Sequence, residues 1–402
     1  MTITQITLDP HDRFSIGDEA IIGPIQTDAG GEDLSSQVEH LDDIRVRIGT
    51  LLKTETVSFL LGAGASVDCG GQLIGSVPLV VERQLQKDGI RGAERPRIRK
   101  WVKTFYRAVQ AAGGDGAPVT RENILARREV LNGGDAEAMP ANFEQVLAML
   151  IRWRSALPKD DGRLRIEASP AIDVNADDLD QCIARATRAL ANACSLPTSD
   201  KEDGLLTYKN LVRKLLTRPL NLKRVNVFTL NYDTLVEQAA DAEGVVLLDG
   251  FVGTQSRVFR PESYEQDLYF PAETTEGRVH RFDRVLHLYK LHGSITWTGN
   301  QPTIDDPYGV KAAAFDPDAT DPLLIYPTPA KYGETLGLPY SELFRRFAST
   351  VARPQSILFV IGYGFGDEHV NAIIRQALAV PSFTLVVVDP SPKSDFITLV
   401  SG

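Results

Sequence analysis

A short apolar run that ends in a glycine-rich turn constrains the fold most strongly. The run 57–61, Val-Ser-Phe-Leu-Leu, is typical of a strand buried on both faces, as in parallel sheets covered by helices. Gly62-Ala63-Gly64-Ala65-Ser66 follows directly. Glycine allows the backbone to turn tightly and to approach a pyrophosphate, whose charge is met by free N–H groups at the next helix start. The alternative is a tight strand–helix turn without a ligand.

Comparable apolar runs recur along the chain and alternate with helical patterns. The clearest helix follows Asp367, a predicted cap, where apolar residues from Val370 to Leu378 keep the spacing of one helical face. This order predicts an α/β fold, with a Rossmann-like parallel sheet flanked by helices and right-handed connections. The other runs interpreted as strands are 225–228, 286–289, 323–326, 357–361 and 384–388.

The chain of 402 residues is too long for one minimal domain and suits either two domains or one large domain with an insertion. Residues 1–50 are interpreted as an N-terminal extension, and residues 51–402 as one nucleotide-binding domain. A helical insertion interrupts this domain at about residues 90–222, where strand-like runs vanish and amphipathic helices dominate. One of these helices is predicted to open on a capping box formed by Asn142 and Gln145.

Charge and cysteine usage narrow the function classes. The formal net charge of −10 argues against strong direct binding to nucleic acid, although it allows a local basic patch. One basic stretch, Arg91 to Arg107, is opposed only by Glu94 and is interpreted as a solvated helix face, or less readily as a contact for an acidic partner or nucleic acid. Three cysteines form neither a disulfide framework nor a C-x-x-C pair. Without a signal-peptide pattern or a long apolar span, we expect a cytoplasmic protein without a membrane partner.

Common nucleotide fingerprints are incomplete. Val67 occupies the third glycine position of G-x-G-x-x-G, and no acidic residue lies at a credible strand end about 20 residues further on, where a dehydrogenase would bind ribose. The P-loop pattern G-x-x-x-x-G-K is absent, which counts against an NTPase.

Polar residues follow several of the predicted strands. Asn231 and Asp233 come after one strand, and taken alone they are better explained as a turn residue and a helix cap. His292 precedes a glycine at another strand end, where ligands of parallel sheets bind and where an imidazole can accept a proton. Gly362 begins a second glycine-rich strand exit, and Asp389 follows the last strand, suited either to a ribose hydroxyl or to a turn.

Together these segments resemble the sirtuin-like family. The resemblance lies in Gly62-Ala63-Gly64-Ala65-Ser66, in Asn231-Tyr232-Asp233 and in His292-Gly293. The bacterial antiphage defence branch is similar in Leu291-His292-Gly293 and in the segment from Gly362 to Asp367. The resemblance spans roughly residues 55 to 390 and covers the helical insertion only loosely. The resemblance implies that residues 51–402 form a sirtuin-like NAD-binding domain.

The resemblance implies roles for individual residues. The turn from Gly62 through Ala63 and Gly64 to Ser66 would bind the NAD pyrophosphate, with Gly362 and Asp389 as further nucleotide contacts. Asn231 would orient water or the nicotinamide ribose, Asp233 would hold that pocket, and His292 would act as base. No metal is predicted, because protein-deacetylating sirtuins carry four cysteines on a zinc module that this sequence cannot supply.

The expected reaction is therefore hydrolysis of NAD to nicotinamide and ADP-ribose by an antiphage effector. An NAD-dependent protein deacylase and a non-catalytic nucleotide-sensing module remain as alternatives. Because an unrestrained enzyme of this kind would kill its host, we expect control by self-assembly into a homo-oligomer or by a separate partner. A HerA-type ATPase is the partner that the resemblance implies. The trigger and the choice between linear and cyclic ADP-ribose stay open.

Overall fold

A computed structural model describes residues 44–389 with several gaps, and also the backbone of residues 14–16 and 19–22. Asn142, of the predicted capping box, lies outside the described residues. So does most of the predicted extension. Its described parts are a short antiparallel pair, β1 (Phe14–Ile16) and β2 (Glu19–Ile22), and all but the last residue of a helix over 44–51. The gaps are 74, 93–95, 115, 134–135, 140–142, 158–161, 167–170, 271–279, 300, 305, 318–321 and 325–337.

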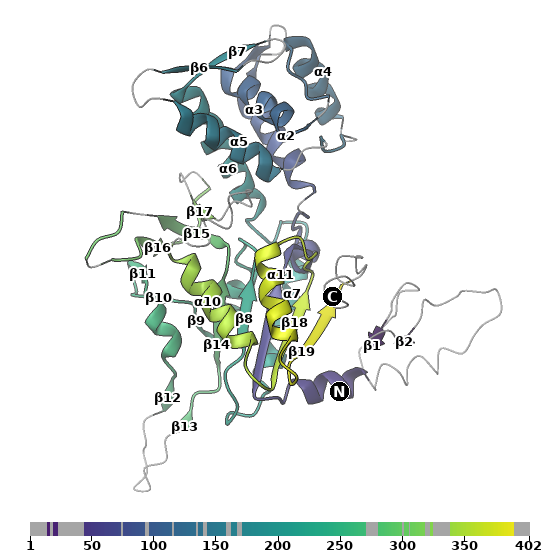
Figure 1. The fold of residues 1–402 in the computed structure, drawn as a ribbon, viewed down its shortest axis with the longest axis vertical. Helices are drawn as coiled ribbons and strands as arrows, with labels where there is room; N and C mark the ends of the chain where they lie inside the picture. The colour runs from purple at the N-terminus through teal and green to yellow at the C-terminus, as the bar shows by residue number, and fades with distance from the viewer. Residues whose placement is uncertain are drawn as a thin grey trace, which may run out of the picture.

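A six-stranded parallel sheet forms the centre of the molecule (Figure 1), which confirms the predicted α/β, Rossmann-like fold. Every neighbouring pair in it is parallel. Its strands, in spatial order, are β19 (Thr384–Val388), β18 (Ser356–Ile361), β3 (Thr56–Leu61), β8 (Asn226–Thr229), β14 (Val285–Lys290) and β9 (Val246–Leu248).

Helices cover both faces of this sheet because alternate side chains of its strands point to opposite sides. Leu60 and Phe228 pack toward α10 (Tyr340–Val351) and α11 (Glu368–Leu378). Phe59 and Val227 pack toward α7 (Leu205–Leu215) and α8 (Leu235–Ala242). All six residues of β3 are buried, as the unbroken apolar run predicts. Asp367 caps α11, as predicted, by accepting a hydrogen bond from the backbone N–H of His369.

Between β3 and β8 the chain builds a separate helical cluster, seen at the top of Figure 1. We call it the helical module. Two short hairpins interrupt its helices, so the prediction that strands vanish here is wrong in detail. The hairpins are too short for hydrophobic periodicity to reveal them. The helices are α2 (Val77–Gly89), α3 (Lys100–Ala111), α4 (Arg121–Asn132), α5 (Phe143–Ala156) and α6 (Ala176–Ala193), and the hairpins are β4 (Ile90–Arg91) with β5 (Arg97–Ile98) and β6 (Arg163–Ile166) with β7 (Ile172–Asn175).

A second sheet is antiparallel and lies between β9 and α10 in the sequence. Residues 323–324 of the predicted run 323–326 belong to this sheet instead of the parallel sheet, because an apolar run of this length does not distinguish parallel from antiparallel pairing. Residues 325–326 lie outside the described residues. Its strands are β10 (Phe251–Val252), β11 (Arg257–Phe259), β16 (Val310–Ala312), β15 (Gly293–Gly299) and β17 (Pro322–Leu324); the hairpin of β12 (Tyr269–Phe270) and β13 (His280–Arg281) projects separately. None of the helices in the described ranges is long and apolar enough to cross a bilayer.

The strand order reverses at β3. From β3 the chain next adds β8 on one side and later adds β18 on the other. In open parallel sheets, ligands bind outside the carboxyl ends of the strands at such a switch point. The glycine turn after β3 and the second glycine-rich exit after β18 therefore flank the position where the topology favours a nucleotide.

Candidate active site

The predicted residues follow the carboxyl ends of neighbouring strands, and these ends are aligned with one another across the sheet. The backbone N–H of Leu230 donates to the carbonyl of Leu61 and that of Leu291 to Thr229, each at 2.9 Å. On the other side of β3, the N–H of Gly62 donates to Ile361 at 2.9 Å. The segments that begin at Gly62, Leu230, Leu291 and Gly362 thus leave the sheet at one edge.

The two glycine-rich exits pack directly on each other. The N–H of Gly64 donates to the carbonyl of Gly362 at 2.8 Å. Gly362 has a φ of +63°, and a Cβ atom there would lie 2.2 Å from the backbone nitrogen of Ala65. A Cβ on Gly62 or Gly64 would also approach the backbone of this second exit closer than 3.0 Å. Glycine is therefore required at these positions by backbone packing, whether or not a ligand binds.

After the turn the chain enters a short 3-10 helix, η1 (Ala63–Cys69), instead of an α-helix. Ala63 is its first residue, and its first turn contains no acidic side chain. The N–H groups of Gly64 and Ala65 already donate to the carbonyls of Gly362 and Gly62. An anion would therefore meet the remaining N-terminal N–H groups of η1, which are not opposed by a carboxylate of their own turn.

Ser66 joins the glycine turn to the segment after β8. Its hydroxyl donates to Oδ2 of Asp233 at 2.7 Å and accepts from Nδ2 of Asn231 at 2.9 Å. The same amide of Asn231 donates to the carbonyl of Gly62 at 2.9 Å. Because both hydrogens of this amide are used, Oδ1 of Asn231 is the atom that remains to accept a hydrogen bond from water or a hydroxyl. The structure thus brings Gly62, Ser66, Asn231 and Asp233 together.

Asp233 is buried and has a structural role as well. Its Oδ1 accepts from the N–H of Leu235, the first residue of α8, at 3.1 Å. The N-cap position itself is occupied by Thr234, so the simpler interpretation of Asp233 as the helix cap holds only in that Asp233 satisfies one N–H at the start of the helix. The hydroxyl of Tyr208, on α7, lies 3.3 Å from Ser66 Oγ. Since the single proton of Ser66 goes to Asp233, Tyr208 is the donor in this contact. Burial raises the pKa of Tyr208 well above its usual value, with the Asp233 carboxylate adding to the effect, so Tyr208 stays protonated.

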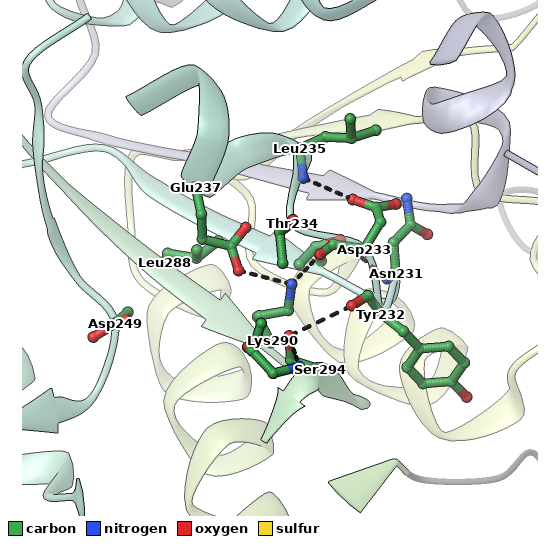
Figure 2. Close-up of polar contacts among 12 residues, drawn as sticks. Asn231, Tyr232, Asp233, Thr234, Leu235, Glu237, Asp249, Leu288, Lys290 and Ser294 are labelled. Carbon is green, nitrogen blue, oxygen red and sulfur yellow. Dashed lines mark hydrogen bonds and ion pairs between the residues drawn. The ribbon is translucent and has the colours of Figure 1, made fainter. Parts of the chain in front are cut away.

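Lys290 supports this segment from below and was not singled out by the sequence (Figure 2). It is the last residue of β14, is 3% exposed, and donates to the carbonyl of Asp233 and to Oε1 of Glu237, the latter at 2.9 Å. Burial raises the pKa of Glu237, and the Lys290 ammonium opposes that rise. The signal available in the sequence was a lysine at the end of an otherwise apolar strand, where an unpaired charge is costly.

His292 lies at the same edge but faces a different neighbour. Its Nε2 is 3.2 Å from Oδ2 of Asp367, and both side chains are at least nine-tenths buried. Its ring also packs near Phe344 of α10, with centroids 6.1 Å apart. Asp367 thus places a carboxylate within ion-pair distance of the imidazole of His292.

The predicted residues therefore form two linked groups. One contains Ser66, Asn231 and Asp233 on the glycine turn, and the other contains His292 and Asp367. They are linked because the glycine turn packs on Gly362, the first residue of the segment that ends in Asp367. Asp389 follows β19, one strand further out, and its half-buried side chain comes next to Val388, whose carbonyl accepts from the N–H of Gly362 at 3.1 Å.

The helical module closes over this edge. Tyr232, between the two predicted polar residues, packs partly against the core of the module. A cleft opens beside it, between α6 and β15, and β15 is tied to the edge by the N–H of Ile295, which donates to the carbonyl of Tyr232 at 3.1 Å. The cleft is lined mainly by Arg188 and Asn192 of α6, Ile295, Thr296 and Thr298 of β15, and residues 313–317.

These features define a Rossmann-like α/β protein whose polar residues converge at the carboxyl edge of its sheet. Residues 225–398 match the family model of the SIR2-like domain, and no curated protein matches the chain. The matched part includes Asn231, Asp233, His292 and Asp367, while the glycine turn precedes it. The match supports a sirtuin-like family and points to the use of NAD. In the described ranges, no group of three or more His, Cys, Asp or Glu side chains is arranged to hold a metal ion.

Proposed function

We propose that this protein is an NAD glycohydrolase that releases nicotinamide and ADP-ribose. The observation that carries the proposal is the convergence of the glycine turn, the Asn231–Asp233 segment and the His292–Asp367 pair at one edge of the sheet. The SIR2-like match indicates NAD as the nucleotide.

The chemistry suits these side chains. Breaking the bond between nicotinamide and ribose returns the bonding electron pair to the pyridinium nitrogen, so nicotinamide leaves as a neutral molecule. Water then forms the new C–O bond and loses one proton. The protein needs to position water and to stabilise positive charge on the ribose carbon, which oriented dipoles in a buried site achieve without further groups.

Each residue has one part in this scheme. The Oδ1 of Asn231 orients the attacking water, because its amide hydrogens are held by Gly62 and Ser66. Asp233 keeps that segment in place and contributes a negative field. His292 accepts the proton, and Asp367 stabilises the resulting imidazolium.

Water is the proposed acceptor because the sequence lacks the cysteines of the zinc module that accompanies the peptide groove of deacetylating sirtuins. The runner-up activity, deacylation, transfers an acyl group to ADP-ribose. By resemblance, we further propose an antiphage effector that depletes NAD and is controlled by homo-oligomer formation or by a HerA-type ATPase.

The test is chromatography of NAD after incubation with the purified chain, with and without candidate partners. We compare the wild type with Asn231→Ala and His292→Ala, and use exposed Asn210→Ala and His280→Ala as matched controls. Binding of NAD is measured in parallel by calorimetry. Loss of turnover in the two site variants, with retained binding in His292→Ala and unchanged controls, supports the proposal.

Other outcomes point elsewhere. Acyl-ADP-ribose formed from an acylated peptide and NAD would indicate a deacylase. NAD binding without turnover in every combination of partners would indicate a nucleotide-sensing module. Turnover that survives both site substitutions contradicts the assigned roles.

A further inference from the structure

The β4–β5 hairpin of the helical module presents arginines on one face only. Ile90 pairs with Ile98, and both pack into the core of the module. Arg91 pairs with Arg97, and both are exposed. Because neighbouring residues in a strand point to opposite faces, the isoleucines hold the hairpin on the module while the arginines face outward.

This pairing places two like charges directly opposite each other, which destabilises a sheet. Arg99, the N-cap residue of α3, adds a third exposed cation two residues after Arg97. Among the described residues, no carboxylate lies within ion-pair distance of these three arginines. Two guanidinium groups held side by side form a surface whose charge suits an anion. Glu94, the acidic residue at the tip of this hairpin, lies outside the described residues.

Further cations surround the hairpin. Arg121, at the start of α4, donates to the carbonyl of Pro96 at 2.6 Å and so lies beside Arg97. Lys87 is exposed on the last turn of α2, just before β4. Two carboxylates lie nearby in sequence: Asp88, which accepts from Gln84, and Glu122. We call Lys87, Arg91, Arg97, Arg99 and Arg121 the basic face.

The basic face contrasts with the charge of the whole chain. Between positions 83 and 107, nine residues are Lys or Arg and two are Asp or Glu, whereas the protein has 43 basic and 53 acidic residues. A polyanion is therefore repelled by most of the molecule and attracted at this face, which gives binding a defined orientation.

We propose that the basic face binds the phosphate backbone of a nucleic acid. Four of its five cations are arginines, whose planar guanidinium groups bind phosphate oxygens in pairs. No large apolar side chain is exposed in the described part of residues 75–129, so the face lacks the apolar anchors of a membrane-surface helix and of a protein interface. Backbone contacts alone give sequence-independent, salt-sensitive affinity.

This proposal is independent of NAD cleavage and departs from the expectation drawn from net charge. Net charge averages over the whole surface, whereas counterion release depends on the cations that touch phosphates.

The experiment measures fluorescence anisotropy of labelled single-stranded DNA, duplex DNA and RNA, each of about 30 nucleotides, with the full chain at about 50 to 200 mM salt. The test variant is Arg91→Gln/Arg97→Gln/Arg99→Gln. A control with the same loss of charge, Lys201→Gln/Lys214→Gln/Lys311→Gln, changes exposed lysines outside the helical module. A variant with Lys at the three arginine positions keeps the charge.

We expect the arginine-to-glutamine variant to bind at least about tenfold more weakly, and the slope of log K against log salt to become less negative by about 2 to 3. The control should stay within about twofold and keep the slope. The lysine variant should also keep the slope, because it keeps the charges, but should bind a few-fold more weakly, because it loses the paired guanidinium contacts. Thermal unfolding at an unchanged or higher temperature verifies that the exposed substitutions leave the fold intact, since removal of two opposed charges does not destabilise the hairpin.

The proposal is overturned if no nucleic acid binds at about 50 mM salt, or if the control weakens binding as much as the test variant. It is also overturned if polyglutamate or vesicles of phosphatidylserine bind through the same arginines as tightly as nucleic acid does, because the face would then be a general anion-binding surface.

Discussion

Removal of the Lys290 ammonium tests how firmly the Asn231–Asp233 segment is held. Lys290 is 3% exposed, its partner Glu237 has a 24% exposed side chain, and their contact is 2.9 Å. Lys290→Met keeps the length of the aliphatic stem but leaves Glu237 and the carbonyl of Asp233 without this donor. Breaking a buried ion pair from one side costs about 3 to 5 kcal/mol, and partial exposure of Glu237 places the expected loss near about 3 kcal/mol.

The control uses the same substitution on the surface. Lys223 contacts Glu55 at 2.8 Å, but the two side chains are 47% and 54% exposed. Lys223→Met is expected to cost less than about 1 kcal/mol, because solvent screens the exposed pair. Both variants are measured by urea denaturation followed by circular dichroism.

The sign of the pH dependence gives a second readout. Burial raises the pKa of Glu237, and loss of Lys290 removes the charge that opposes the rise. A carboxyl group with a raised pKa in the folded state binds its proton more tightly there, so stability falls as pH increases toward that pKa. The Lys290→Met defect should therefore be larger at about pH 8 than at about pH 5. A loss below about 0.5 kcal/mol, equal at both pH values, would refute the assignment of a tight supporting pair.

Three further substitutions test other parts of the structure. Burial lowers the pKa of His287 to about 4, so the free energy of unfolding is expected to fall by up to about 3 kcal/mol as pH decreases from about 6.5 to about 4. In thermal unfolding, His287→Gln should remove that part of the pH dependence, and identical pH profiles of the variant and the wild type would contradict this. Gly362→Ala should destabilise the fold by about 3 kcal/mol or prevent folding, because its Cβ would lie 2.2 Å from a backbone nitrogen. The control Gly364→Ala, whose Cβ would have nothing within 4 Å, should change the unfolding temperature little. Ser66→Ala should cost about 2 kcal/mol in denaturant unfolding, because it removes a buried hydroxyl that makes three hydrogen bonds; a change below about 0.5 kcal/mol would show that these bonds do not hold the edge together.

Local patterns predicted the elements of the fold. The apolar run of β3 and the cap at Asp367 are recognisable because each depends on neighbours within a few residues. The β4–β5 hairpin was missed because each of its strands has two residues. The placement of β17 was missed because hydrophobic periodicity does not report the direction of a pairing strand.

The site was predictable as a set of strand exits but not as a set of contacts. Ser66 and Asp233 are 167 positions apart, and only the register of β3 against β8 brings them within hydrogen-bond distance. Lys290 and Glu237 are separated by 53 positions and depend on the register of β14. Because sequence patterns do not specify these registers, the contacts of Lys290 with Glu237 and with the carbonyl of Asp233 could not be predicted from the sequence. The assigned roles of Asn231 and His292 stay predictions until turnover is measured.

The geometry also explains why the glycine turn and the Asn-x-Asp segment act as one unit. The hydroxyl of Ser66 accepts from Asn231 and Tyr208 and donates to Asp233, so its hydrogen-bonding capacity is used completely. The glycines of the turn let the backbone reach Gly362, which brings Ser66 within reach of the β8 exit. Each motif alone has a structural explanation, as a tight turn or as a helix cap. Because both motifs share the buried hydroxyl of Ser66, Oδ1 of Asn231 is directed away from the turn. Neither a tight turn nor a helix cap by itself requires this orientation of Asn231.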